Sequence, residues 1–167
     1  MDTSGVLLES PTRTAMTVGA ITAALMLAVL TLGLQIAGWL VFAGGIFWGM
    51  KRFKNECGGV ITYFRAWIAG FQTAFFASII LAFIAYVTTT WNPSLITAML
   101  DAVEQQLTTM EVPSGLIEPA MQQWREIFSP MVFGIIIIFM YSAIGFFVSI
   151  LCAFFVWNTK PVEIVDF

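Results

Sequence analysis

A short stretch of charged residues and glycines, Lys51-Arg-Phe-Lys-Asn-Glu-Cys-Gly-Gly59, separates two long apolar regions, residues 14–50 and 62–91. It carries three of the seven basic residues of the chain, and Arg65 follows soon after it. Short loops rich in Lys and Arg stay on the cytoplasmic side of a membrane. The stretch therefore predicts a membrane protein and a cytoplasmic loop at this position.

The composition also indicates a helical membrane protein. Of the 167 residues, 59% are hydrophobic and only 10% are charged, whereas soluble domains are about half apolar and about a quarter charged. A β-barrel would show short alternating segments instead of long apolar runs. We expect an all-α integral membrane protein with a single membrane domain, residues 1–167, and with no cleavable signal peptide.

Four transmembrane helices are expected, because a span needs roughly 20 apolar residues. The first apolar region is too long for one span, and we divide it at Gly33, beside Gln35, the one strongly polar side chain there. One long tilted helix is the alternative. Ser10 followed by Pro11 is typical of a helix start. The predicted spans are about residues 11–32, 36–53, 61–90 and 130–157.

Residues 92–129 differ from the rest and carry five of the ten acidic side chains of the chain, against a single basic one, Arg125. Apolar residues recur there at helical spacing, which predicts a two-helix amphipathic extracytoplasmic segment between spans 3 and 4. Its carboxylates could hold a hard cation, although a solvated helix face is the simpler interpretation; they are Asp101, Glu104, Glu111, Glu118 and Glu126. The expected partner surface is Leu100, Val103, Leu107, Met121 and Trp124.

The basic residues predict the topology. With four spans, every Lys and Arg except Arg125 falls on one side, including Arg13 and Lys160. Both termini are then cytoplasmic. The residues that could bind lipid headgroups are Lys51, Arg52, Lys54 and Arg65, although setting the topology is the simpler role for them.

Small residues recur at spacings that let helices approach closely within lipid. The predicted helix-packing residues are Gly45, Gly49, Ala66, Gly70, Ala74, Ser78, Gly145 and Ser149. Packing within one chain is the simpler interpretation, and a homodimer face is the alternative.

The sequence contains no constellation that is typical of catalysis. There is no His, which excludes a Ser-His or Cys-His nucleophile within this chain. Cys57 and Cys152 lie far apart and do not match zinc, haem or iron–sulfur patterns. No Asp, Glu, Lys or Arg lies near the centre of a predicted span, which argues against a pump or a proton-coupled carrier. We expect no enzyme activity, no cofactor, no metal and no nucleic-acid partner.

Residues 58–71, GGVITYFRAWIAGF, carry a resemblance to a known family, together with the Gln-rich acidic segment and Phe128-Ser-Pro130. Over about residues 15–156 the chain resembles the domain-of-unknown-function family forty-one ninety-nine, although Trp67 is bulkier than the residue expected there. The resemblance implies a four-span protein of the bacterial inner membrane. It also implies a gene encoded near those of membrane glycosyltransferases, and it supplies no catalytic residues.

These observations favour a non-enzymatic accessory or scaffold subunit of a bacterial inner-membrane assembly. Its partners would be the lipid bilayer and another membrane protein or a second copy of the chain. The alternative is a protein that binds or transports a lipid or a lipid-linked sugar carrier, beside a membrane glycosyltransferase, through Arg65 and the intramembrane Gln72. An enzyme that uses the outer carboxylates is a third hypothesis.

Overall fold

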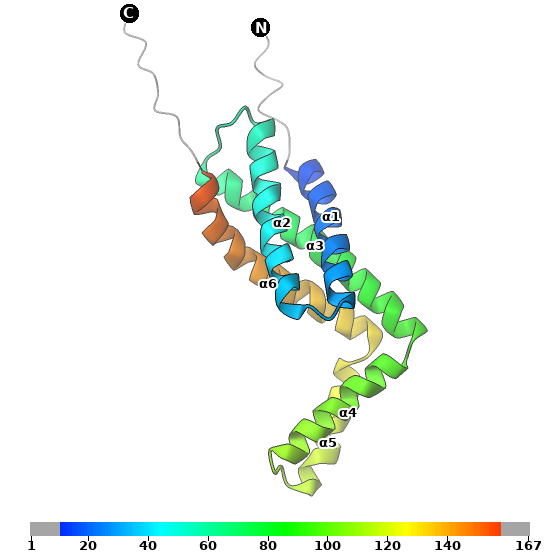
Figure 1. Cartoon of the computed structure of the whole chain (residues 1–167). Helices are drawn as coiled ribbons and strands as arrows, with labels where there is room; N and C mark the ends of the chain where they lie inside the picture. The colour runs from blue at the N-terminus through cyan, green and yellow to red at the C-terminus, as the bar shows by residue number, and fades with distance from the viewer. Residues whose placement is uncertain (1–10, 158–167) are drawn as a thin grey trace, which may run out of the picture. The chain divides into compact units, whose positions relative to one another are not determined.

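The computed structural model describes residues 11–157, and its regular elements are six α-helices (Figure 1). These are α1 (Thr12–Thr31), α2 (Gln35–Glu56), α3 (Tyr63–Trp91), α4 (Ser94–Thr109), α5 (Ser114–Ile127) and α6 (Pro130–Val156). The prediction of an all-helical chain is confirmed for these residues. Ser10, Lys160 and the rest of both tails lie outside the described residues.

Three of the helices, α1, α3 and α6, are long and apolar enough to cross a membrane by length and composition. The expected second span corresponds to α2, which is not one of these three helices, and its last turns carry charged residues. Its apolar run, Ile36–Met50, covers roughly 22 Å at 1.5 Å per residue, less than a hydrocarbon core of about 30 Å.

The first two helices are separated where the sequence predicts. α1 ends at Thr31, α2 begins at Gln35, and Gly33 in the turn has a φ of +74°. Glycine adopts this left-handed conformation without the steric cost that a Cβ would add. One continuous helix through this region is therefore not formed.

The end of α2 differs from the prediction. Lys51, Arg52 and Lys54 lie on the last turns of the helix, which continues to Glu56. The sequence predicted a charged loop here and a span that ends at about residue 53, so the loop was expected to begin too early. Arg52 and Glu56 are one turn apart and form an ion pair of 3.5 Å, a spacing that supports a helix. The helix ends just before Gly58 and Gly59, which both have positive φ.

The chain divides into two compact units, with the division falling within α3 and within α6. Unit 1 comprises Met1–Ile80 and Met140–Phe167, and unit 2 comprises Leu81–Phe139. In unit 1, α1 packs along α2, and segments of α3 and α6 complete the core. The largest fully buried side chains include Phe42, Phe53, Met26, Ile46 and Met50.

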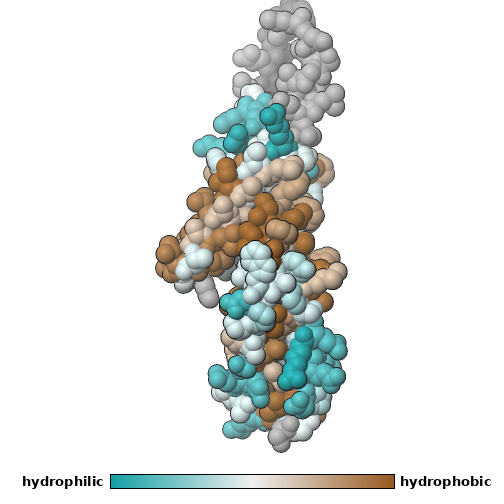
Figure 2. Space-filling view, turned by 90° about the vertical axis from the view of Figure 1, so that its right-hand side faces the viewer, coloured by the Kyte–Doolittle hydropathy of each residue, from teal (hydrophilic) through white to brown (hydrophobic). Residues whose placement is uncertain are grey.

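Unit 2 contains the two short helices predicted within residues 92–129, α4 and α5, which pack against each other. Met121 of α5 is 4% exposed. Trp124 stacks on Phe128 with ring centroids 5.7 Å apart. Hydrophilic side chains cover much of the surface of these two helices (Figure 2), as expected for an amphipathic pair.

Candidate functional site

The charged residues after Met50 lie at one end of unit 1, which we call the basic end: Lys51, Arg52, Lys54 and Arg65. Lys54 is half-buried, and its Nζ donates a hydrogen bond of 2.8 Å to the carbonyl of Val156, at the end of α6. The C-terminus of a helix carries partial negative charge and unpaired carbonyl groups. Lys54 therefore caps α6, and its charge is engaged within the chain.

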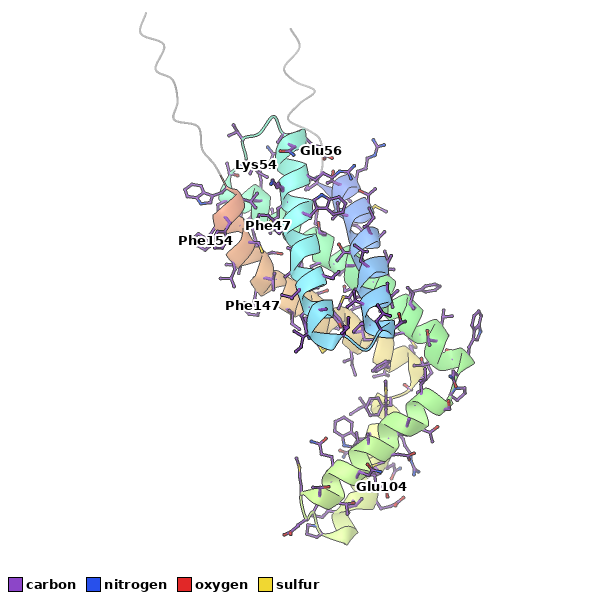
Figure 3. The ribbon with its side chains drawn as sticks, in the orientation of Figure 1. Phe47, Lys54, Glu56, Glu104, Phe147 and Phe154 are labelled. Carbon is purple, nitrogen blue, oxygen red and sulfur yellow. The ribbon has the colours of Figure 1, made fainter. Side chains whose placement is uncertain are left out.

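Glu56 lies beside Lys54 at the end of α2 (Figure 3) and joins α2 to α1. It pairs with Arg52 at 3.5 Å and accepts a hydrogen bond from the hydroxyl of Thr14 in the first turn of α1. Thr14 is buried. The charge of Arg52 is thus balanced locally, although the pair is solvent-accessible and contributes only a little stability.

Arg65 and Lys51 differ from the other two basic residues. The guanidinium of Arg65 lies 5.7 Å from the ring centroid of Phe53, a cation–π distance. Within residues 11–157, neither Arg65 nor Lys51 forms an ion pair. Of the four headgroup candidates, these two have a charge that no acidic side chain of the described chain neutralises.

Tyr63, at the start of α3, also joins two helices at the basic end, because it contacts α6. Its hydroxyl donates a hydrogen bond of 3.1 Å to the carbonyl of Ile150 in α6, and its ring lies 4.9 Å from that of Phe154. The beginnings of α1 and α3 and the ends of α2 and α6 are thus linked to one another at this end.

The predicted helix-packing residues lie between helices of unit 1. A Cβ at Gly45 would overlap the side chain of Thr22 in α1, and one at Gly49 would lie 2.5 Å from Thr73 Oγ1 in α3. Thr73 Oγ1 itself donates to the carbonyl of Ala69. Threonine side chains therefore occupy the space that these glycines leave in α2, a pairing that the small-residue pattern did not reveal.

The small-residue stripe of α3 is also used within the chain. A Cβ at Gly70 would overlap Met50 of α2 and lie 3.0 Å from Ser149 Oγ of α6. A Cβ at Gly145 would overlap Ala74, and Ala66 is fully buried. Further along, the hydroxyl groups of Ser78 and Ser142 are 3.1 Å apart. These residues hold α3 against α2 and α6, so the stripe is covered before any partner binds.

Three buried polar atoms have no hydrogen-bond partner within the described residues: Trp67 Nε1, Gln72 Oε1 and Ser149 Oγ. Gln72, which the lipid-carrier hypothesis uses, thus has a buried carbonyl oxygen that accepts no hydrogen bond from the described residues. Trp67 packs edge-on against Phe146 of α6, with ring centroids 5.3 Å apart. These atoms are dispersed along α3 and α6, and no hydrogen bond among the described residues joins them into one binding site.

The family of the chain is known. A family model described as "Protein of unknown function (DUF4199)" matches residues 13–158. The chain belongs to this family. No curated protein and no solved structure matches it. Membership in DUF4199 confirms the resemblance seen in the sequence and assigns no catalytic or ligand-binding residue.

In this DUF4199 chain, the residues expected to form a partner surface lie on α4 and α5. Met121 is buried, and the other four are half-buried; these are Leu100, Val103, Leu107 and Trp124. Part of this apolar surface is therefore already covered within unit 2.

The carboxylates of unit 2 are all exposed. Asp101 and Glu104 line an open depression on α4 together with Gln105, Thr108 and Thr109. Among the described residues, no three His, Cys, Asp or Glu side chains are arranged to hold a metal ion. The outer face of α4, with Glu104 upon it (Figure 3), has the character of a solvated helix surface.

Proposed function

We propose that this DUF4199 protein is a non-enzymatic accessory or scaffold subunit of a membrane protein assembly in the bacterial inner membrane. It crosses the membrane with four helices, α1, α2, α3 and α6, and its termini are cytoplasmic. The pair α4 and α5 lies on the opposite side.

The links at the basic end support this topology. Thr14 joins the start of α1 to the end of α2, Lys54 joins the end of α2 to the end of α6, and Tyr63 joins the start of α3 to α6. An antiparallel arrangement of four helices brings these ends together on one side. The positive charge of the same residues then favours the cytoplasm.

The observation that carries the scaffold function is the exposure of α6. Along its most apolar stretch α6 is only 11% buried, compared with 39% for α1 and 44% for α3. Within unit 1, Phe147 and Phe154 lie two turns apart on one side of α6 and are 66% and 61% exposed (Figure 3). We call Met140, Phe147, Leu151 and Phe154 the aromatic face of α6.

Phe147 and Phe154 of this face offer large rigid side chains to a partner helix. Helices associate within lipid through van der Waals packing, because the surrounding acyl chains are as apolar as the side chains. Aromatic residues supply much contact area with few rotatable bonds. The partner that we propose is therefore a transmembrane helix of another protein, and it packs on the aromatic face of α6.

Photo-crosslinking in native membranes tests this proposal. A photoreactive phenylalanine analogue is placed at Phe147 and, as a matched control, at Leu25 of α1, which is 53% exposed. We expect residue 147 to form an adduct with one protein, identified by mass spectrometry, and residue 25 to form adducts with lipid. Lipid adducts alone at both positions would contradict a scaffold role for this face.

A second candidate function, binding of a lipid or a lipid-linked carrier, is favoured by one observation. Lys51 and Arg65 are cations that no acidic residue within 11–157 neutralises, and phosphate groups attract such cations at a membrane surface. Native mass spectrometry of the chain and of the variant Arg65→Ala tests it, with Arg125→Ala in unit 2 as the control. An anionic lipid retained by all three proteins alike would argue against this site.

A further inference from the structure

The turn between α1 and α2 exposes several large apolar side chains. Leu32 is 73% exposed, Leu34 is 54% exposed, and Ile36, in the first turn of α2, is 81% exposed. Leu40, one turn further along, is also exposed. We call Leu32, Leu34 and Ile36 the apolar tip.

No charged residue lies between Arg13 and Lys51, and Gln35 is the one strongly polar residue beside the turn. Fully burying a Leu or Ile side chain is worth about 1.5–3 kcal/mol. Three such side chains together at one turn therefore favour an apolar environment. A lipid surface or a protein groove are the two candidates.

The length of α1 indicates where the tip lies if the basic end is at one membrane surface. α1 has 20 residues, which gives about 30 Å at 1.5 Å per residue. A hydrocarbon core is also about 30 Å thick. With Arg13 at one surface, the turn thus reaches the boundary of the opposite leaflet and does not extend far beyond it.

The backbone of the turn excludes a deeper position. The N–H groups of Gly33 and Leu34 donate to carbonyls of α1, Leu30 and Val29, at 3.0 and 3.3 Å. The first N–H group of α2 that bonds within the turn region is that of Gly38, to Leu34. The N–H groups of residues 35–37 precede it, at the start of a helix where intrahelical acceptors are lacking. Such groups need water or headgroup oxygens, which the hydrocarbon centre does not offer.

We infer that the apolar tip is a lipid-binding element. It is seated at the boundary between acyl chains and headgroups of the leaflet opposite the basic end. There the leucine and isoleucine side chains contact acyl chains, while the open N–H groups of α2 contact water and headgroup oxygens. The hairpin of α1 and α2 therefore ends within the far surface of the bilayer and forms no loop in the aqueous phase. The inference rests on the membrane placement proposed above.

Spin-label accessibility in vesicles that contain only this protein and lipid tests the inference. The full chain, with Cys57→Ala and Cys152→Ala, is reconstituted in vesicles of phosphatidylcholine and phosphatidylglycerol. Labels are attached to Leu32→Cys or Leu34→Cys, which are exposed positions where a change leaves the packing intact. Leu25→Cys, in the middle of α1, is the hydrocarbon reference, and Gln105→Cys, on the exposed face of α4, is the water reference.

We expect collisions with oxygen and with a water-soluble nickel complex at both tip positions to fall between the two references. Partial desolvation also raises the pKa of a thiol, and one pKa unit reduces the thiolate about tenfold. Unlabelled Leu32→Cys is thus expected to react with a maleimide at least about tenfold more slowly than Gln105→Cys.

Two results would overturn the inference. A tip label as accessible to nickel as the label at residue 105 would place the turn in water, and the four-span topology would survive. A tip label as shielded as the label at residue 25 would place the turn in the hydrocarbon, and would also contradict α2 as a full span. Neither result bears on the crosslink at Phe147, so the scaffold function is tested separately.

Discussion

Replacing Gly45 with alanine tests whether α1 and α2 are held in close contact through Thr22. A Cβ at residue 45 would overlap both γ atoms of Thr22 and would lie 2.8 Å from its Cβ. Rotation of the Thr22 side chain cannot relieve the last contact, because a Cβ is fixed to the backbone. The two helices must therefore move apart. Gly44, one residue earlier in α2, has no atom within 4 Å of the corresponding position.

The adjacent glycines allow the packing cost to be isolated. Alanine is favoured over glycine in a helix by about 1 kcal/mol, and this increase in helix stability applies equally to Gly44→Ala and Gly45→Ala. An extra methyl group in a packed interior costs about 1–3 kcal/mol, and only Gly45→Ala incurs this cost. We expect Gly45→Ala to have a free energy of unfolding about 1–3 kcal/mol lower than that of Gly44→Ala.

Unfolding in mixed micelles, titrated with a denaturing detergent and followed by circular dichroism, gives both values. Thr22→Ala removes the two overlapping γ atoms, so it is expected to restore part of the loss when combined with Gly45→Ala. Equal stability of the two glycine variants would refute the close contact between α1 and α2. A loss in Gly45→Ala that Thr22→Ala leaves unchanged would show that Thr22 is not its cause.

Three further predictions concern single contacts, and the first two use the same measurement. Lys54→Met removes the cap from α6 and is expected to cost about 1 kcal/mol, whereas Lys51→Met is expected to change little; equal effects would show that the cap is not formed. Tyr63→Phe removes one hydrogen bond between α3 and α6 and is expected to cost about 1 kcal/mol, and wild-type stability would argue against that bond. Met121→Ala leaves a cavity between α4 and α5 and is expected to cost about 2–5 kcal/mol, monitored by hydrogen exchange in these helices, with the exposed Leu116→Ala as the control. Similar exchange in both variants would contradict a packed interior in unit 2.

Much of the secondary structure could be predicted from the sequence, because apolar helices of this length have simple sequence features. Long apolar runs, proline at helix starts and glycine in turns placed α1, α2, α3 and α6 within a few residues of their bounds, and the two shorter helices lie within the segment 92–129 that was predicted to hold them. The end of α2 was placed too early. The charges after Met50 were interpreted as a loop, whereas the helix continues through them with the support of the Arg52–Glu56 pair.

The contacts that link the helices were harder to predict. Thr14 meets Glu56 and Lys54 meets Val156 across 42 and 102 residues, and no local pattern encodes such pairings. Small residues indicated that helices approach one another but did not indicate which side chain fills the space. Family membership adds no functional residue in this case, so the function remains a proposal that rests on the exposed face of α6.

The cap that Lys54 places on α6 has a consequence for biosynthesis. Lys54 precedes its acceptor by 102 residues, so a ribosome that adds about 5–20 residues per second needs roughly 5–20 s between them. During this interval the ammonium group and the α3 surface around Ala74 lack their final neighbours. A nascent chain that stops before α6 retains those open groups permanently. The hydrogen bond between Lys54 and Val156 therefore forms only in a chain that includes α6, and a product truncated before α6 cannot form it.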